Sequence, residues 1–345
     1  MALPLPNGGR AEGLSVRSKS ILRDVAQKAG VSLRTASRVL NDDPRVADTT
    51  RERVRQVMQD LRYTPDSMAR SLRAGTDATI GLVVESVADP FFSELVAAVE
   101  SATWDDGKSV LVASTHRDPE RERRAVNHML QRRVSGLLVV PTCGDHSWLR
   151  DTGVPLVLVD RAADGLDADV VGIDDRKAAF DVVSHLVAHG HRDIAYVGDH
   201  PQIPTSAARL DGYREAMAHH GLTVRGELVR ADCPTSQEAA VAMGELLALS
   251  HSPTAVLSAA TRCSLGVVPT LHSTGRTDIA LVGFGDFAMA DTLSPAVSVI
   301  EHSATAVGLA AVARLSERVA DAQLACQTLH VPVRLLQRGS GEQRP

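Results

Sequence analysis

The stretch Leu22-Arg-Asp-Val-Ala-Gln-Lys-Ala-Gly-Val-Ser-Leu-Arg-Thr-Ala-Ser-Arg-Val-Leu-Asn41 decides how the N-terminal end of this 345-residue chain folds. Its first apolar residues have the spacing of a helix with one buried face: Leu22, Val25, Ala26 and Ala29. Gly30 can end that helix in the left-handed conformation, and Ser32 can cap a second helix. Because only a few residues separate the two helices, we expect them to pack at a steep angle.

A third helix is predicted from about Asp48, with Asp48 or Thr49 as its cap, and completes a small bundle. One face of the second helix is then left exposed, and it is rich in hydroxyl, amide and guanidinium groups. Such groups hold phosphate oxygens or read base edges in the major groove, although a bundle with an arbitrary polar face has the same pattern. The residues on that face are Ser32, Leu33, Arg34, Thr35, Ser37, Arg38 and Asn41.

The charge of the chain is unevenly distributed. Its net charge is −5, but residues 1–75 carry 14 Lys and Arg against 8 Asp and Glu, and the remainder carries 23 against 34. A basic end on an acidic body is expected when only that end approaches nucleic acid. A positively charged disordered tail would have the same asymmetry.

Composition excludes several other classes of protein. The chain is 44% hydrophobic and 23% charged, and it has no apolar run of about 18 residues that could span a membrane. Residues 1–19 lack the apolar core of a signal peptide, so we expect a cytoplasmic, nucleoid-associated protein. The four cysteines have no metal-ligand spacing and are predicted to be reduced. We predict no enzymatic activity, no cofactor and no metal. His185, His189 and His191 are interpreted as the end of a helix.

Beyond Thr76 the chain alternates short apolar runs with helical stretches. The helices include Phe92–Asp105, Arg121–Gln131 and Lys177–Ala188. Continuous Val, Leu and Ile runs are typical of parallel strands buried on both faces, so the pattern predicts doubly wound α/β sheets. About 260 residues favour two similar lobes over a single sheet. The predicted strands are Thr79–Val84, Ser109–Ala113, Gly136–Val140, Leu156–Val159, Ile194–Val197, Ala255–Ser258 and Ile279–Phe284.

The segment 22–41 resembles the DNA-binding headpiece of the LacI/GalR family, and Pro65–Arg73 resembles the hinge helix of that family. The resemblance covers about residues 20–338. It implies that Leu33, Arg34 and Arg38 read bases, and that Ser32, Thr35, Ser37 and Asn41 position the helix on phosphate. It also implies that Leu72, with Ala69 beside it, wedges into the minor groove. The sequence departs from the family at Ile21, where threonine usually caps the first helix, and at Asp66, where asparagine is common.

The resemblance also implies the domain organisation. A flexible extension (1–19) precedes the headpiece (20–64) and a hinge with its linker (65–76). A two-lobed domain of the type I periplasmic-binding-protein kind (77–338) and a flexible tail (339–345) follow. The N-lobe comprises about 77–174 and 301–328, the C-lobe about 175–300 and 329–338, and the chain crosses between them three times. An effector is expected in the cleft, near the carboxyl ends of the strands.

The expected effector contacts are partly altered. The resemblance assigns Phe92 to the pocket, Asp160-Arg161 and Arg209 to ligand hydroxyls, and Asp174 to the first crossover. Ala260-Thr261 stands where the family has Asn-Asp, and Gly285-Asp286 stands where it has Asp-Asp. Cys233 stands where many members place an aromatic ring. Either the C-lobe uses different side chains, or the ligand differs from a common hexose, or the effector role has decayed.

The sequence thus predicts a transcriptional repressor that binds a pseudo-palindromic operator as a homodimer and senses a sugar or polyol. The residues after Val333 lack a leucine heptad, so no coiled-coil tetramer is expected. Two alternatives remain open: a DNA-binding regulator whose altered pocket responds to a protein partner, and a solute-binding receptor.

Overall fold

The computed structural model describes residues 22–40, 43–61, 63, 79–104 and 106–345. Internal contacts divide the chain into two units, Met1–Gly75 and Thr76–Pro345. The predicted N-terminal extension, the hinge at 65–73 with Ala69 and Leu72, and Asn41 lie outside the described residues. No helix among the described residues is long and apolar enough to cross a membrane.

In its described residues the first unit forms three short helices, α1 (Leu22–Lys28), α2 (Leu33–Leu40) and α3 (Asp48–Asp60). Gly30 lies between α1 and α2 with φ +61°, and the Thr35 N–H donates to the Ser32 hydroxyl over 3.0 Å, as the sequence predicts. The cap of α3 differs: Ala47 occupies that position without a side-chain bond, and Asp48 lies in the first turn, where its charge favours the helix dipole. The core is formed by Val25, Ala29, Val39, Val46 and Val54.

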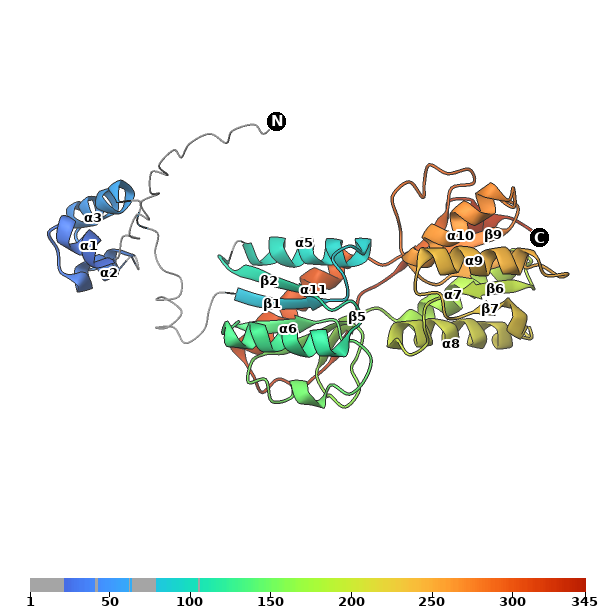
Figure 1. The fold of residues 1–345 in the computed structure, drawn as a ribbon, viewed down its shortest axis with the longest axis horizontal. Coiled ribbons are helices and arrows are strands. Elements are labelled where there is room, and N and C mark those ends of the chain that lie inside the picture. Colours follow the sequence, from blue (N-terminus) through green and yellow to red (C-terminus); the bar gives the residue numbers. More distant parts are fainter. Residues whose placement is uncertain (1–21, 41–42, 62, 64–78, 105) are drawn as a thin grey trace, which may run out of the picture. The chain divides into compact units, whose positions relative to one another are not determined.

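The N-lobe is built on a parallel six-stranded sheet in the order β11-β5-β4-β3-β1-β2. One face is covered by α5 (Pro90–Trp104) and α11 (Ala304–Ala320), and the other by α6 (Pro119–Gln131), as Figure 1 shows. Helices on both faces explain why most of these strands are almost continuously apolar. The strands are β1 (Thr79–Val84), β2 (Ser109–Ser114), β3 (Gly136–Val139), β4 (Leu156–Asp160), β5 (Asp169–Gly172) and β11 (Thr328–His330).

The C-lobe repeats this architecture with a sheet in the order β12-β10-β9-β8-β6-β7. Helices α7 (Asp175–Ala188) and α8 (Pro204–His219) cover one face, and α9 (Ser236–Leu247) and α10 (Thr261–Ser273) cover the other. Only β12 runs antiparallel to its neighbour. The strands are β6 (Ile194–Val197), β7 (Val229–Arg230), β8 (Ala255–Ser258), β9 (Ala280–Phe284), β10 (Ser298–Glu301) and β12 (Arg334–Leu336).

The chain passes between the lobes three times: from β5 to α7, from β10 to α11, and from β11 to β12. The predicted fold class, two doubly wound lobes behind a helical headpiece, is therefore confirmed. All seven predicted strands are present within a residue at either end. The five strands that the sequence did not predict are short, from two to four residues, and three lie at sheet edges.

Residues 339–345, expected to be a flexible tail, are instead docked on the C-lobe. They form a short 3-10 helix (Ser340–Glu342), and the Ser340 hydroxyl donates to the Leu281 carbonyl over 2.6 Å. The docking is possible because Ser340 and Gly341 are small enough to be buried against β9 and β10. The His185 Nε2 lies 2.9 Å from the Glu342 carboxylate, so this histidine helps to hold the C-terminal segment on the C-lobe. The described residues hold no cluster able to bind a metal ion.

Candidate functional site

The first candidate site is the outer face of α2. Ser32, Leu33 and Arg34 are exposed at its start, and the Leu33 side chain remains 48% exposed. Thr35, Ser37 and Arg38 are half-buried on the following turn, while Ala36 and Val39 face the core. Apart from Ser32, which directly precedes it, the described residues of the predicted DNA-binding face therefore lie on α2, at positions other than those of the buried Ala36 and Val39.

The end of this face is organised by Asp43. Arg45 binds the Asp43 carboxylate through two guanidinium bonds of 2.9 and 2.8 Å, and Arg38 approaches it at 3.7 Å. The hydrogen bonds from Arg45 lower the pKa of Asp43 to about 2. Arg38 is thus loosely held by a carboxylate that stays ionised, which orients its guanidinium without burying it.

The second candidate site is a cavity between the two lobes. It is lined by residues at or just beyond the carboxyl ends of β1, β4, β6, β8, β9 and β10, together with residues in the first turns of α5, α8 and α10. This is the position at which open α/β sheets bind ligands. Five of the sequence-predicted effector residues line it: Phe92, Asp160, Arg161, Arg209 and Ala260.

Asp160 ends β4 in the left-handed backbone conformation, with φ +71°. For a residue with a Cβ this conformation costs about 1 kcal/mol or more and is often found at functional sites. The Arg161 Nε donates to the Asp160 carboxylate over 2.9 Å, and Arg161 also approaches Glu85 at 3.4 Å. The strained turn therefore directs a carboxylate and a buried guanidinium to the same cavity.

Arg209 lies on α8 and is almost completely buried. Its Nε donates to Asp175 over 2.7 Å, its Nη1 donates to the Ala259 carbonyl over 2.8 Å, and its guanidinium lies 3.9 Å from the centre of the Phe284 ring. Burial raises the pKa of Asp175 to about 6, although the charge of Arg209 opposes the increase. Arg209 is consequently fixed in one orientation before any ligand binds.

An aromatic wall closes one side of the cavity. His302 lies between Phe91 and Phe284, with ring centroids 4.9 and 5.5 Å away. Burial lowers the pKa of His302 to about 4, and the charge of Arg209 adds to the decrease, so the ring is neutral at pH 7. None of the described residues hydrogen-bonds its buried Nδ1. His302 therefore contributes a neutral ring to the cavity wall.

The positions that depart from the family pattern have local structural reasons. Gly285 has φ +88°, and a Cβ there would collide with the Thr261 hydroxyl and press on the His302 ring. Ala260 precedes α10 without a side-chain cap, while the Thr261 hydroxyl donates to the Phe284 carbonyl over 3.2 Å. Thr261 and His302 thus occupy the space that a larger residue at 285 would need.

Three other sequence-predicted effector residues lie away from this cavity. Asp174 caps α7 by accepting the Lys177 N–H over 3.0 Å, and its neighbour Asp175 reaches Arg209 instead. Cys233 lines a separate hollow beside α9. Asp286 is bound by Arg338 through bonds of 2.8 and 2.6 Å, which lower its pKa. Asp174 is one residue before the aspartate that reaches the cavity wall, Cys233 belongs to a neighbouring loop, and Asp286 is held by its ion pair with Arg338.

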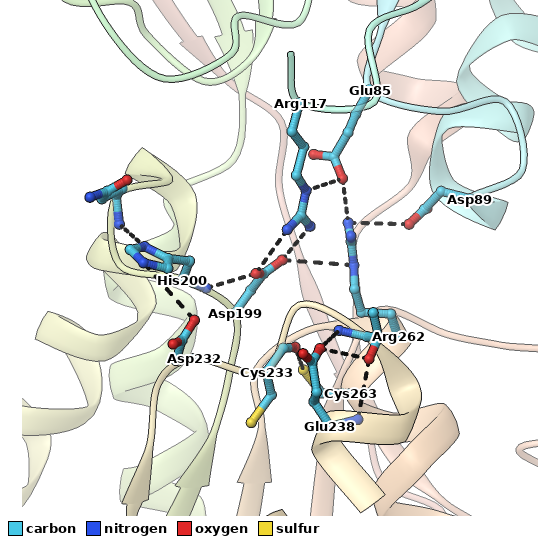
Figure 2. Close-up of polar contacts among 12 residues, drawn as sticks. Glu85, Asp89, Arg117, Asp199, His200, Asp232, Cys233, Glu238, Arg262 and Cys263 are labelled. Carbon is cyan, nitrogen blue, oxygen red and sulfur yellow. Dashed lines mark hydrogen bonds and ion pairs between the residues drawn. The ribbon is translucent and has the colours of Figure 1, made fainter.

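A group of charged residues at the cavity was not predicted from the sequence. Glu85 follows β1 and Asp199 closely follows β6, so the rule that ligand sites lie after parallel strands could have identified both. Arg117 and Arg262 are harder to find by this rule, because they lie three and four residues beyond β2 and β8, in a turn and in the first turn of α10. Figure 2 shows the two arginines sharing the carboxylates of Glu85 and Asp199.

Comparison with known proteins assigns both units to a family. Residues 21–66 match the model of the bacterial regulatory proteins of the lacI family. Residues 77–339 match the model of the periplasmic binding proteins and sugar binding domain of the LacI family. The two models together cover most of the chain.

Individual relatives agree with this assignment. The chain is 31% identical over 288 residues to the HTH-type transcriptional regulator GalR of Escherichia coli, covering 81% of this chain and 84% of the relative. It is 30% identical over 309 residues to the HTH-type transcriptional repressor PurR of Vibrio campbellii, covering 87% and 92%. The lac repressor dimer bound to operator and the anti-inducer ONPF superposes with a TM-score of 0.85 at 26% identity, covering 94% of this chain and 99% of that one.

The fold and the comparisons define a DNA-binding transcriptional regulator with a periplasmic-binding-protein-like body. The chain belongs to the LacI family, which is a family of transcription regulators and not of enzymes.

Proposed function

We propose that this regulator is a repressor that binds a pseudo-palindromic operator as a homodimer, and that a small hydroxylated metabolite of the sugar or polyol class modulates its affinity for DNA. The observation that carries the proposal is the pairing of an exposed reading helix with a cleft whose polar groups come from both lobes. A ligand held by both lobes can bias their arrangement.

On the DNA side, we assign base contacts to Leu33, Arg34 and Arg38. Ser32, Thr35, Ser37 and Asn41 contact phosphate, and Ala69 and Leu72 enter the minor groove. The exposed apolar side chain of Leu33 supports this assignment, because it lies at the start of α2, where a recognition helix approaches bases. A two-fold dimer follows from the short reach of one such helix.

On the effector side, the cavity offers hydrogen-bond groups suited to an uncharged, hydroxylated ligand. Asp160 accepts, Arg161 and Arg209 donate, and the neutral ring of His302 lies beside the aromatic rings in the wall. The guanidinium groups of Arg161 and Arg209 are already paired with carboxylates. An anionic ligand would therefore compete with fixed charges, whereas a polyol would add hydrogen bonds to them. The description of the matching family as a sugar binding domain agrees with this choice.

The DNA-binding part is tested by selecting genomic fragments on the full-length protein and sequencing them. We expect one pseudo-palindromic motif, and binding that weakens steeply as salt rises. Recovery of fragments without a shared motif would contradict the proposal.

The effector part is tested by thermal-shift screening of sugars, polyols and sugar phosphates, followed by operator titrations with any compound that stabilises the protein. We expect an uncharged compound to bind, and Asp160→Asn to weaken that binding. Asp286→Asn is the matched control, because Asp286 is ion-paired to Arg338 outside the cavity.

A second candidate function, response to a protein partner, is favoured by one observation. The cavity volume is about 60 Å³. Pockets that bury a small molecule usually measure about 300–1,000 Å³. If the whole panel fails to stabilise the protein and a protein partner copurifies that alters operator binding, this second function holds.

A further inference from the structure

Five charged side chains form a continuous cluster across the cleft. Glu85, Asp89 and Arg117 belong to the N-lobe, since they follow β1 or β2 or precede α5. Asp199 and Arg262 belong to the C-lobe, after β6 and at the start of α10. Figure 2 shows the two guanidinium groups lying among the three carboxylates. We call these five residues the interlobe cluster.

Each arginine binds a carboxylate of its own lobe and one of the opposite lobe. Arg117 donates from Nε to Glu85 over 2.8 Å, and from Nη1 and Nη2 to both oxygens of Asp199 over 3.1 and 2.5 Å. Arg262 mirrors this: its Nη2 lies 2.9 Å from Glu85 and 3.4 Å from Asp89, and its Nε lies 3.8 Å from Asp199. An arginine of each lobe therefore binds a carboxylate of the other lobe.

The cluster is shielded enough for these bonds to matter. The side chains of Glu85 and Asp199 are only 8% and 5% exposed. Burial by itself would raise the pKa of Glu85, but the charges of Arg262, Arg161 and Arg117 outweigh it and lower the pKa to about 2. Glu85 therefore remains ionised, and ion pairs at this depth are screened by salt less than surface pairs are.

The distribution of charge also allows the cluster to separate. If the lobes move apart, Arg117 keeps Glu85 on its own side, and Arg262 keeps Asp199 on the other. No charge is left buried without a partner, because opening also admits water. This distinguishes the cluster from a fixed buried ion pair, whose rupture leaves an uncompensated charge.

The cluster also limits the space in the cleft. Glu85, Asp89, Asp199 and Arg262 are themselves part of the wall of this partly open cavity, whose volume is about 60 Å³. A ligand of several hydroxylated carbons does not fit without displacement of the wall. The groups that bind the lobes together are thus the groups that such a ligand must displace.

We propose that the interlobe cluster is an ionic latch that holds the two lobes closed in the absence of effector, so that effector entry requires its release. The second half of this statement rests on the effector site proposed above. The first half concerns this chain alone and is tested without effector or DNA.

The test measures the distance between the lobes in the full-length protein. A keto amino acid at the exposed positions Asn127 on α6 and Ala218 on α8 takes spin labels without involving the native thiols. Labelled chains are diluted with unlabelled protein, and electron–electron double resonance gives the distance distribution. We expect one narrow distribution for the native cluster, and a longer, broader one for Arg117→Gln/Arg262→Gln.

The reciprocal exchange Arg117→Asp/Asp199→Arg keeps both charges while swapping their lobes. We expect its distance distribution to be narrower and shorter than that of Arg117→Asp alone or of Asp199→Arg alone, because the exchange restores the pairing across the cleft and nothing else. Arg176→Gln, which breaks the exposed pair with Glu215, is the matched control and leaves the distribution unchanged. Circular dichroism verifies that each variant is folded.

A native distribution that is already broad, or one unaffected by Arg117→Gln/Arg262→Gln in a folded protein, would overturn the latch. This outcome differs from failure of the proposed function, which would be recorded as absence of stabilisation by the sugar and polyol panel.

Discussion

The two candidate sites treat their arginines in opposite ways. On α2, Arg34 is exposed, and Arg38 is held only loosely by Asp43 at 3.7 Å. In the cleft, Arg161 and Arg209 are almost fully buried and bind carboxylates at 2.9 and 2.7 Å. Both sites belong to one chain, but one presents positive charge to solvent and the other neutralises it internally.

This difference reflects the ligand that each site serves. DNA brings a dense row of phosphates, and its binding is strengthened by releasing counterions from exposed cations. A small uncharged ligand brings no charge to a buried site, so an unpaired guanidinium there would be destabilising. If the contrast between exposed and neutralised arginines governs stability and binding, substitutions in the cleft should mainly lower stability and those on α2 should mainly lower affinity for DNA.

The largest effect is expected from Glu85→Gln. The substitution preserves shape but leaves Arg117, Arg161 and Arg262 without their shared carboxylate. Removal of one partner from a buried ion pair costs about 3–5 kcal/mol, and we expect the free energy of unfolding of the body to fall by about 3 kcal/mol in urea titrations. Glu215→Gln, at the surface pair with Arg176, should change it by less than about 1 kcal/mol. Equal losses of stability in Glu85→Gln and Glu215→Gln would show that the buried ion pairs matter no more than a surface pair.

The same carboxylate predicts a dependence on pH. The pKa of Glu85 is lowered from 4.5 to about 2, so its stabilising effect is complete above pH 4.5 and is lost as the pH falls through about 2. We expect the stability difference between native protein and Glu85→Gln, about 3 kcal/mol near neutrality, to shrink by about two thirds by pH 3. Denaturant titrations at pH 7, 5, 4 and 3 measure it. A difference independent of pH would show that the charge of Glu85 is not responsible.

An intermediate effect is expected at the DNA-binding face. Arg38→Ala should weaken operator binding by about 1–3 kcal/mol, which is about 5- to 150-fold, and relax the preference at one base position. Fluorescence anisotropy on the selected operator and on its single-base variants measures both. Arg214→Ala, on an exposed turn of α8, removes the same charge from the body and should leave affinity unchanged. Uniform weakening across all sequences would assign Arg38 to phosphate instead.

The smallest effect is expected at Asp174, which separates structural from ligand-binding carboxylates. Asp174→Ala removes the cap of α7 and should lower the free energy of unfolding by about 1 kcal/mol. Calorimetric titration with the compound identified in the screen should give an unchanged dissociation constant. Weakened binding in this variant would show that Asp174 contacts the effector after all.

Much of the fold was predictable from local patterns. The headpiece helices follow from apolar spacing and from Gly30 and Ser32, and the central strands follow from their Val, Leu and Ile runs. Strands such as β7 and β12 were not predictable, because two or three residues at a sheet edge carry no periodic signal. The docked C-terminal segment was missed because its small polar residues are typical of a loop.

The cleft was only partly predictable. Asp160 and Arg209 were found because a motif marks their positions in the chain. Asp175 was missed by one residue, since helix phase decides which of two adjacent aspartates faces inward. The interlobe cluster was missed because its members are up to 177 residues apart in the sequence.

The sequence by itself determined the class of this protein, its headpiece and the two-lobed body. These features depend on local spacing and on motifs that fold in the same way wherever they occur. Only the tertiary structure decided which charges meet across the cleft, because ion pairs between lobes depend on how the two lobes pack against each other and not on neighbours in the chain. The same holds for the size of the cavity, which is set by side chains packed from both lobes.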